Sequence, residues 1–277
     1  MSMSIRTNVA SLNAQRNLSS TQTALNSSMA RLSSGFRITK AGDDAAGLGI
    51  STKLEAQIRS YNQAVRNAND GISVIQTTES ALDNTANMLT RLRELAMQSA
   101  SDGVGDSERA YINTESGQLL NELDRISSVT EYNGTKLLSG ASASGLDFQV
   151  GIANTGNDRI NFNTLDASTG ASGLNVSGLD LSSKVSAQAA LDSIDKALAT
   201  VSSGRSTLGA AGNRLQSAIN NIQAFSESLS AANSRIKDVD VAQETSNMSR
   251  LQILSQAGVS VLAQANQMPQ LALKLLG

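Results

Sequence analysis

The side chains that most often carry chemistry are missing from this sequence. Its 277 residues include no Cys and no His. Without a thiolate or an imidazole there can be no disulfide, no Cys/His metal site and no nucleophile–His pair. Carboxylates, hydroxyls and amides remain, so adjacent acids and glycine-rich stretches are the places where chemistry would have to lie.

Those stretches lack the spacing that catalysis or cofactor binding requires. Asp43 and Asp44 are neighbours in a glycine-containing connector, where adjacent acids usually form a solvated turn or cap a helix. The run Gly47-Leu-Gly-Ile begins like a dinucleotide fingerprint, but the third glycine position holds Thr52. The stretch 102–106 (DGVGD) lacks the calcium-loop spacing. We therefore expect no enzyme activity, no catalytic residue, no metal and no other cofactor.

Composition narrows the class of protein further. The formal net charge is -2, which argues against a protein that holds nucleic acid through phosphate contacts. No stretch of 18 apolar residues is present, so we expect no membrane insertion. The first ten residues lack the apolar core of a cleaved secretory signal, so a protein that leaves the cell would need another export route. Aromatic residues make up 3% of the chain, which favours long helices that bury narrow stripes.

Glycine divides the chain into two arms and a centre. Residues 101–185 hold 11 of the 21 glycines, and glycine is costly inside helices. We therefore expect loops and strands in the centre and helices in both flanks. A shorter helix is expected over 107–128, and the alternation of Leu146, Phe148, Val150 and Ile152 predicts a β-hairpin. A weaker alternation covers 174–181.

Both arms show the 3–4 spacing of a coiled-coil seam. In a helix expected over 45–100, the stripe is interrupted at Glu79 and then resumes. Its members are Leu54, Ile58, Tyr61, Val65, Ala68, Ile72, Ile75, Leu82, Ala86 and Leu89. The second arm carries Leu191, Ile194, Leu198, Val201, Arg205, Leu208, Gly212, Leu215, Ile219 and Ile222, and after a three-residue slip Phe225, Leu229, Ala232, Ile236 and Val239. The two helices are expected to pack on one another.

An outer amphipathic piece lies at each end of the chain, over 5–34 and 247–276. Few large anchors are present, so we expect these pieces to be disordered in the monomer and to fold on assembly. Pro269 is expected to interrupt the second piece. A stripe is more often core than interface, but these pieces have no partner in the rest of the chain. A head-to-tail contact between such ends does not close, and therefore builds a filament.

Several separate blocks stand in order along the sequence. They are NVASLNAQ (8–15), LSSG (32–35), DDAAG (43–47), RNANDGISVIQ (66–76), RELAMQ (93–98), YNGTKLL (132–138), NSRI (233–236), NMSR (247–250) and VLAQANQ (261–267). Together these blocks resemble bacterial flagellin, and the resemblance covers about 1–140 and 186–277.

The resemblance implies a mainly α fold with long antiparallel coiled-coil helices from both chain ends and a small central β-hairpin region. It implies a terminal filament-core domain with its connector over 1–42 and 240–277, and an outer helical domain over 43–239 with the hairpin at about 140–185. The centre is too short for further outer domains. The connector 39–43 (TKAGD) differs from the commoner family pattern.

The function expected from the resemblance is that of a structural subunit which self-assembles into the helical filament of the bacterial flagellum for swimming motility. The protein would be secreted, extracellular and part of that filament. Ten apolar positions are expected to bury against neighbouring subunits: Val9, Leu12, Leu18, Leu25, Leu251, Leu254, Val261, Leu262, Leu271 and Leu275.

The partners implied by the resemblance are other copies of the chain in a homo-polymer, flagellar junction and cap proteins, and the flagellar type III export apparatus. A secretion chaperone is expected on the C-terminal helix, about 235–277. Recognition of the free monomer by the flagellin-sensing Toll-like receptor is expected at Arg91, Leu95 and Glu115. The alternative is a hook–filament junction protein, a flagellin-like adaptor of the same apparatus, which would share both arms without forming long polymers.

Overall fold

The computed structural model describes residues 7–140 and 145–276, with the backbone alone over 269–276. Most of the chain is helical. The elements are α1 (Val9–Ser34), α2 (Ala45–Ser99), α3 (Asp106–Val129), β1 (Glu131–Tyr132), β2 (Thr135–Lys136), β3 (Leu146–Gln149), the 3-10 turn η1 (Gly156–Asp158), β4 (Arg159–Phe162), α4 (Lys184–Lys237) and α5 (Val241–Leu276). The mainly α fold with a small hairpin region is confirmed.

The chain separates into two compact units. The first comprises residues 1–58 and 227–277, and the second comprises 59–226. The boundaries expected from the sequence, at 42/43 and 239/240, fall inside the first unit. Helices α2 and α4 contribute to both units, and each unit has its own pair of antiparallel helices.

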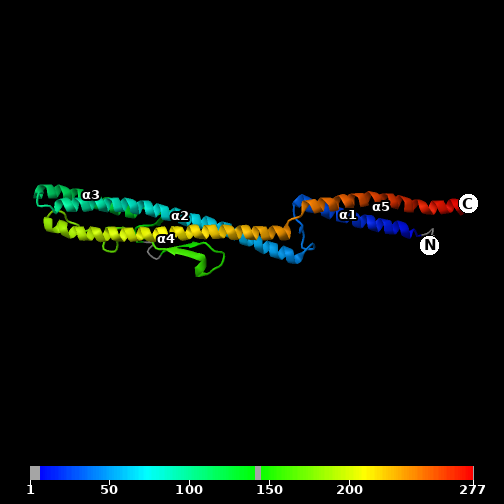
Figure 1. Ribbon diagram of the computed structural model, residues 1–277, viewed down its shortest axis with the longest axis horizontal. Helices are drawn as coiled ribbons and strands as arrows, with labels where there is room; N and C mark the ends of the chain where they lie inside the picture. The colour runs from blue at the N-terminus through cyan, green and yellow to red at the C-terminus, as the bar shows by residue number, and fades with distance from the viewer. Residues whose placement is uncertain (1–6, 141–144, 277) are drawn as a thin grey trace. The chain divides into compact units, whose positions relative to one another are not determined.

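In the second unit α2 and α4 run antiparallel, side by side (Figure 1). Leu215 of α4 lies close to Gly71, and Arg93 of α2 pairs with Asp195 at 2.7 Å. The buried seam of α2 keeps its 3–4 steps without a break. Its members are Ala64, Ala68, Gly71, Ile75, Thr78, Leu82, Thr85, Leu89, Leu92, Ala96 and Ser99.

The interruption expected at Glu79 is therefore wrong. The seam passes through Thr78 and Thr85, which are almost fully buried. Their hydroxyls donate to the carbonyls of Val74 and Ala81, at 2.7 and 3.0 Å. A hydroxyl that is satisfied by its own helix can occupy a core position at little cost.

On α4 the seam alternates between large and small residues. The large residues of the expected stripe are buried at Ile194, Val201, Leu208, Leu215, Ile219 and Ile222. Up to Leu215 the other seam positions are small, and they precede by one residue those that the sequence suggested. They are Ala190, Ala197, Gly204 and Ala211. Phe225, expected in the seam, is 60% exposed and stacks on Tyr61 at 6.3 Å between ring centroids.

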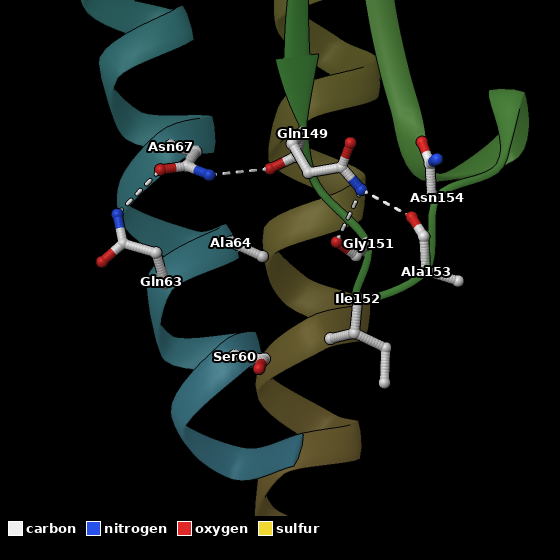
Figure 2. Close-up of a pocket in the computed structure, with 9 residues that line it drawn as sticks. All are labelled: Ser60, Gln63, Ala64, Asn67, Gln149, Gly151, Ile152, Ala153 and Asn154. Carbon is white, nitrogen blue, oxygen red and sulfur yellow. Dashed lines mark hydrogen bonds between the residues drawn. The ribbon is translucent and has the colours of Figure 1, made fainter. Parts of the chain in front are cut away.

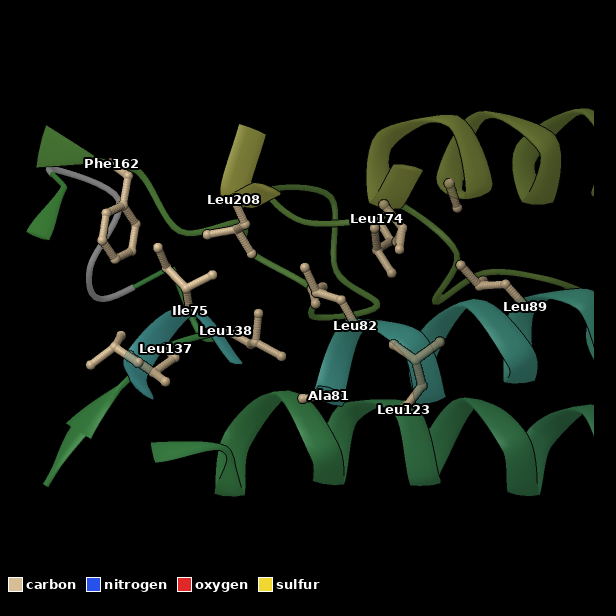
Figure 3. Close-up of a cluster of buried hydrophobic side chains, with 14 of the residues drawn as sticks. Ile75, Ala81, Leu82, Leu89, Leu123, Leu137, Leu138, Phe162, Leu174 and Leu208 are labelled. Carbon is tan, nitrogen blue, oxygen red and sulfur yellow. The ribbon is translucent and has the colours of Figure 1, made fainter. Parts of the chain in front are cut away.

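Helix α3 and the central loops cover this helix pair (Figure 3). Leu123 of α3, Leu137, Leu138 and Leu174 are buried with Leu82 and Leu89 in one cluster. No strand forms over 174–181, where the alternation was weak. Instead, Asp124 of α3 accepts hydrogen bonds from the backbone N–H and the hydroxyl of Thr169, at 2.8 and 2.7 Å, and so holds the preceding loop.

Two small hairpins complete the second unit. Strands β1 and β2 pair across Asn133 and Gly134, whose φ angles of 48° and 79° suit a tight two-residue turn. Strands β3 and β4 pair antiparallel with Phe148 opposite Ile160, and the Phe148 and Phe162 rings stack at 5.5 Å. A Cβ at Gly71 would lie 3.1 Å from the Phe148 ring, so the lack of a side chain at this position lets β3 pack closely against α2.

In the first unit α1 and α5 lie side by side (Figure 1). Both outer pieces, expected to order only on assembly, are helical and paired with each other. Helix α5 continues through Pro269 to Leu276, so the expected interruption is absent from the backbone. Gly258 approaches Leu18 closely enough that an added Cβ would lie 3.3 Å from the leucine side chain.

The connectors of the first unit cross each other next to the helix ends. Phe36 forms an antiparallel bridge with Asp238, and the N–H of Arg37 donates to the carbonyl of Lys237 at 2.6 Å. The Lys237 ammonium lies 4.4 Å from the centre of the Phe36 ring and also pairs with Glu55. This clip ties the connector to α2 and α4.

Candidate interaction surfaces

The positions expected to polymerise divide between two faces of the terminal helices. Leu25 is buried and Leu18, Leu251 and Leu262 are half-buried, because they lie in the seam between α1 and α5. Leu271 and Leu275 lie in α5, but their side chains are outside the described part of the chain. The remaining four positions are exposed: Val9 61%, Leu12 45%, Leu254 49% and Val261 54%.

The seam between α1 and α5 is narrow and partly polar. Its α1 side runs through Ser11, Ala14, Leu18, Thr21, Leu25, Ser28 and Leu32, and its α5 side through Glu244, Met248, Leu251, Ser255, Gly258, Leu262 and Ala265. The Asn8 amide donates to the carbonyl of Ala265 at 2.8 Å, and the Ser11 hydroxyl to Asn266 at 2.7 Å. These hydrogen bonds hold α1 against α5 at a place where the two helices bury little apolar surface.

A second apolar stripe lies on the outward face of α5. Leu254, Val261 and Met268 are each about half exposed and follow one another at seven-residue spacing. Of the intermediate positions that complete the 3–4 steps, Ala257 is apolar and Gln264 is polar, and both are exposed. An apolar face at this spacing is the pattern of a helix that packs against a further helix. We call the four apolar residues the outward stripe.

The positions expected for receptor recognition lie on α2 and α3, in the second unit. Arg91 pairs with Glu115 at 2.9 Å and with Glu94 at 3.1 Å. All three side chains are about half exposed, so this network contributes little to folding. The hydrogen bond that Arg91 donates to Glu115 is the main reason why the pKa of Arg91 is raised. Leu95 is 1% exposed and packs in the core beneath them.

A shallow groove lies between α2 and the loop that follows β3 (Figure 2). Its amide side chains are bonded within the chain. Asn67 donates to the carbonyl of Gln149 at 3.1 Å, and Gln149 donates to the carbonyls of Gly151 and Ala153 at 2.9 and 2.8 Å. Gln63 also donates to Asn67, at 2.9 Å. The groove is thus a network that fastens the hairpin end to α2.

The adjacent acids of the connector both accept hydrogen bonds from backbone N–H groups. Asp44 accepts a hydrogen bond from the N–H of Gly47 at 2.8 Å, as an N-cap of α2 should. Asp43 accepts from the backbone N–H groups of Thr39 and Lys40 and from the Thr39 hydroxyl. These bonds, the backbone N–H of Thr39 first, hold the pKa of Asp43 below its ordinary value.

Two features of the described surface bear on other classes of function. Among the residues that the structure describes, no group of three or more acidic side chains is placed to hold a metal ion. Across the same residues, no helix has both the length and the apolar character that crossing a bilayer requires. What the surface does present is long helices, exposed apolar positions at heptad spacing and exposed ion pairs.

Sequence reasoning missed two structural residues. Arg109, a charged residue in an exposed-looking stretch, is buried and binds the carbonyls at the end of α2. Lys237 joins three segments in the connector clip. The hydrophobic periodicity of the sequence indicates the role of neither residue, because both bind backbone groups or residues that are distant in the sequence.

An uncovered apolar stripe on a paired long helix is typical of proteins that pack against further chains. The bacterial flagellin N-terminal helical region matches residues 5–143, and the bacterial flagellin C-terminal helical region matches 191–276. The chain belongs to the bacterial flagellin family.

Relatives of full length support the same assignment. Flagellin of Halalkalibacterium halodurans is 45% identical, with 99% of this chain and 100% of that protein covered. Flagellin of Bacillus subtilis is 42% identical with the same coverage, and the flagellar filament 33 kDa core protein of Treponema phagedenis is 39% identical, also with the same coverage. Flagellins are structural proteins, and this chain is a subunit of the extracellular filament of the bacterial flagellum.

One solved structure shows a similar fold. A structure described as a flagellar hook-associated protein from Vibrio parahaemolyticus has a TM-score of 0.60 at 16% identity, covering 71% of this chain and all of that chain. Bacillus cereus flagellin matches at 25% identity with a TM-score of 0.49, over 57% of this chain and 88% of that one.

Proposed function

We propose that subunits of the filament contact one another through the outward stripe of α5, together with Val9 and Leu12 of α1. The observation that carries this is the seven-residue spacing of Leu254, Val261 and Met268 on a helix whose other face is already covered by α1. Each large side chain left in water forgoes about 1.5–3 kcal/mol of burial. A neighbouring copy supplies the apolar surface that recovers it.

This proposal divides the ten expected positions by role. Val9, Leu12, Leu254 and Val261 contact the neighbouring subunit, and Leu271 and Leu275 continue the same 3–4 steps in the sequence. Leu18, Leu25, Leu251 and Leu262 act indirectly, because they hold α1 against α5 and so set the shape of the surface.

The test is growth of filaments from seeds. Leu254→Asp places a charge in the outward stripe, whereas Gln252→Asp places the same charge on an exposed polar position of the same helix. We expect Leu254→Asp to slow elongation at least tenfold and Gln252→Asp to grow within about twofold of the parent, because burial of an unpaired charge is costly. Equal growth of the two variants would contradict the proposal.

The same stripe gives the expected chaperone a surface before assembly. We propose that a secretion chaperone covers α5 within 235–277, that the chain is exported unfolded through the flagellar type III apparatus, and that junction and cap proteins meet the filament ends. In support, α5 carries the uncovered apolar residues of this segment.

The alternative function, a hook–filament junction protein, is distinguished by sedimentation after seeding. A filament subunit forms long polymers, whereas a junction protein stays small.

We propose recognition of the free monomer by the flagellin-sensing Toll-like receptor at the exposed pair Arg91 and Glu115. Leu95 would act from beneath, by holding the packing of α2. Receptor-reporter cells are the test, with Arg91→Ala as the variant and Arg125→Ala as the control, since Arg125 is an exposed arginine in an intrahelical pair. Silence of the unmodified monomer at nanomolar dose would end this idea.

A further inference from the structure

The outward stripe contains a chemically reactive side chain. Met268 is 55% exposed and takes the large position after Leu254 and Val261. A methionine thioether is a two-electron reductant, and its sulfoxide is polar. Among the side chains of the outward stripe, that of Met268 is therefore the one that an oxidant can change from apolar to polar.

The other described methionines lie in different surroundings. Met88 packs against the core of the second unit, and Met248 is half-buried between α1 and α5. Met29 of α1 and Met97 of α2 are exposed to 45% and 54%, but neither belongs to the outward stripe. Met97 thus matches Met268 in exposure and differs from it in position.

We propose that Met268 is a modification site at which a peroxide blocks addition of the subunit to a filament. In the reaction the thioether sulfur attacks one peroxide oxygen, the O–O bond breaks, and the sulfur is oxidised to the sulfoxide. With hydrogen peroxide the other oxygen leaves as water. The inference rests on the proposed assembly surface, because the effect requires the stripe to be buried in the polymer.

The effect follows from what burial does to the oxidised side chain. The thioether can be covered by apolar neighbours without loss, whereas the sulfoxide oxygen needs a hydrogen-bond donor. The side chains of Leu254, Ala257 and Val261 offer none. Gln264, one turn before Met268, has an amide, but a copy that covers this face must then bury the amide and the sulfoxide together.

The free monomer is the form on which the oxidant acts. Subunits already in a filament would have Met268 covered by the neighbouring copy, so the sulfur is accessible only before addition. Methionine sulfoxide reductases restore the thioether, which makes the block reversible.

The experiment treats the full chain with hydrogen peroxide, removes the oxidant, and measures elongation from untreated seeds, with sulfoxide at each methionine followed by mass spectrometry. The variants are Met268→Leu and the exposure-matched Met97→Leu. We expect oxidation to slow the parent and Met97→Leu at least tenfold, and Met268→Leu to keep its rate within about twofold. Treatment with MsrA and MsrB should restore the parent.

Either of two results overturns the proposal: an oxidised parent with sulfoxide at Met268 that elongates normally, or Met268→Leu that is slowed as much as the parent. Met268→Gln gives a second test that needs no oxidant, since it places a polar group of similar length in the stripe; it should elongate slowly, and normal growth contradicts the inference. Failure of the assembly surface itself shows separately, as normal growth of untreated Leu254→Asp.

Discussion

Among single residues, Arg109 closes the turn between α2 and α3. Its guanidinium donates to the carbonyls of Ser99 and Ser101, both at 2.9 Å, and pairs with Asp106 at 3.1 Å, while 10% of its side chain is exposed. The carbonyls at a helix end have no partner within the helix. Arg109 supplies those partners from the first turns of the next helix.

Arg109→Ala should therefore lower the free energy of unfolding by about 2–4 kcal/mol, because the buried carbonyl of Ser99 and the part-buried carbonyl of Ser101 lose a charged donor. The control is Arg125→Ala, where the side chain is 57% exposed and pairs with Glu122 of the same helix. Its expected cost is much smaller than that of Arg109→Ala, because an exposed ion pair adds little to stability. Urea unfolding followed by circular dichroism measures both; equal costs would show that burial of Arg109 is unimportant.

Replacement of Gly71 by alanine is expected to have the opposite effect on stability from the same replacement at most helical glycines. Alanine gains about 1 kcal/mol over glycine in a helix interior. At Gly71, however, the new methyl would lie 3.1 Å from both Phe148 and Leu215, and such overpacking costs about 1–3 kcal/mol. We expect Gly71→Ala to destabilise the chain, whereas Gly117→Ala on α3, with no atom within 4 Å, should stabilise it. Thermal unfolding of the two variants gives the signs.

At the level of elements, helix positions were more predictable than helix faces. The helix expected over 45–100 is Ala45–Ser99, and the one expected over 107–128 is Asp106–Val129. The residues of the buried seam were harder to predict, because Thr78, Thr85 and the alanines of α4 are only weakly hydrophobic and yet pack in the core. Periodicity identifies large apolar residues, whereas close helix packing also selects small ones.

We expect two ion pairs of the second unit to make its stability depend on pH in the acid range. The hydrogen bond from Arg93 of α2 holds the pKa of Asp195 of α4 below its ordinary 3.8, and the Lys184 bond does the same for the pKa of Asp102. Such a carboxylate contributes its stabilisation fully above the ordinary value. The contribution is lost as the pH falls through the lowered one, when the folded state also binds the proton.

Asp195→Asn should therefore reduce the fall in melting temperature between pH 5 and pH 3, and it should lower the melting temperature at pH 7. Asp192→Asn, one turn away and exposed, removes a carboxylate that has no ion pair among the described residues. Melting curves at pH 7, 5 and 3 make the comparison. An acid response of Asp195→Asn identical to that of the parent would contradict the assignment.

For the whole molecule, the sequence indicated that the ends assemble but not which side of each helix does so. Leu251 and Ala265 face α1, whereas Leu254, Val261 and Met268 face outward, and all five fit a 3–4 pattern in the sequence. Because α5 has apolar residues on two faces, the periodicity of the sequence does not define a single stripe. Only the pairing of α5 with α1 distinguishes the two faces.

Removal of residues 271–277 tests assembly without disturbing the fold. The described seam between α1 and α5 ends at Ala265, and among the described residues the core of the second unit contains none beyond Ile222. The truncated chain should therefore keep the unfolding transition of its parent. It loses Leu271 and Leu275, which continue the steps of the outward stripe. We expect a folded protein that fails to elongate seeds, seen by electron microscopy and sedimentation; normal filaments would show that the stripe ends before residue 271.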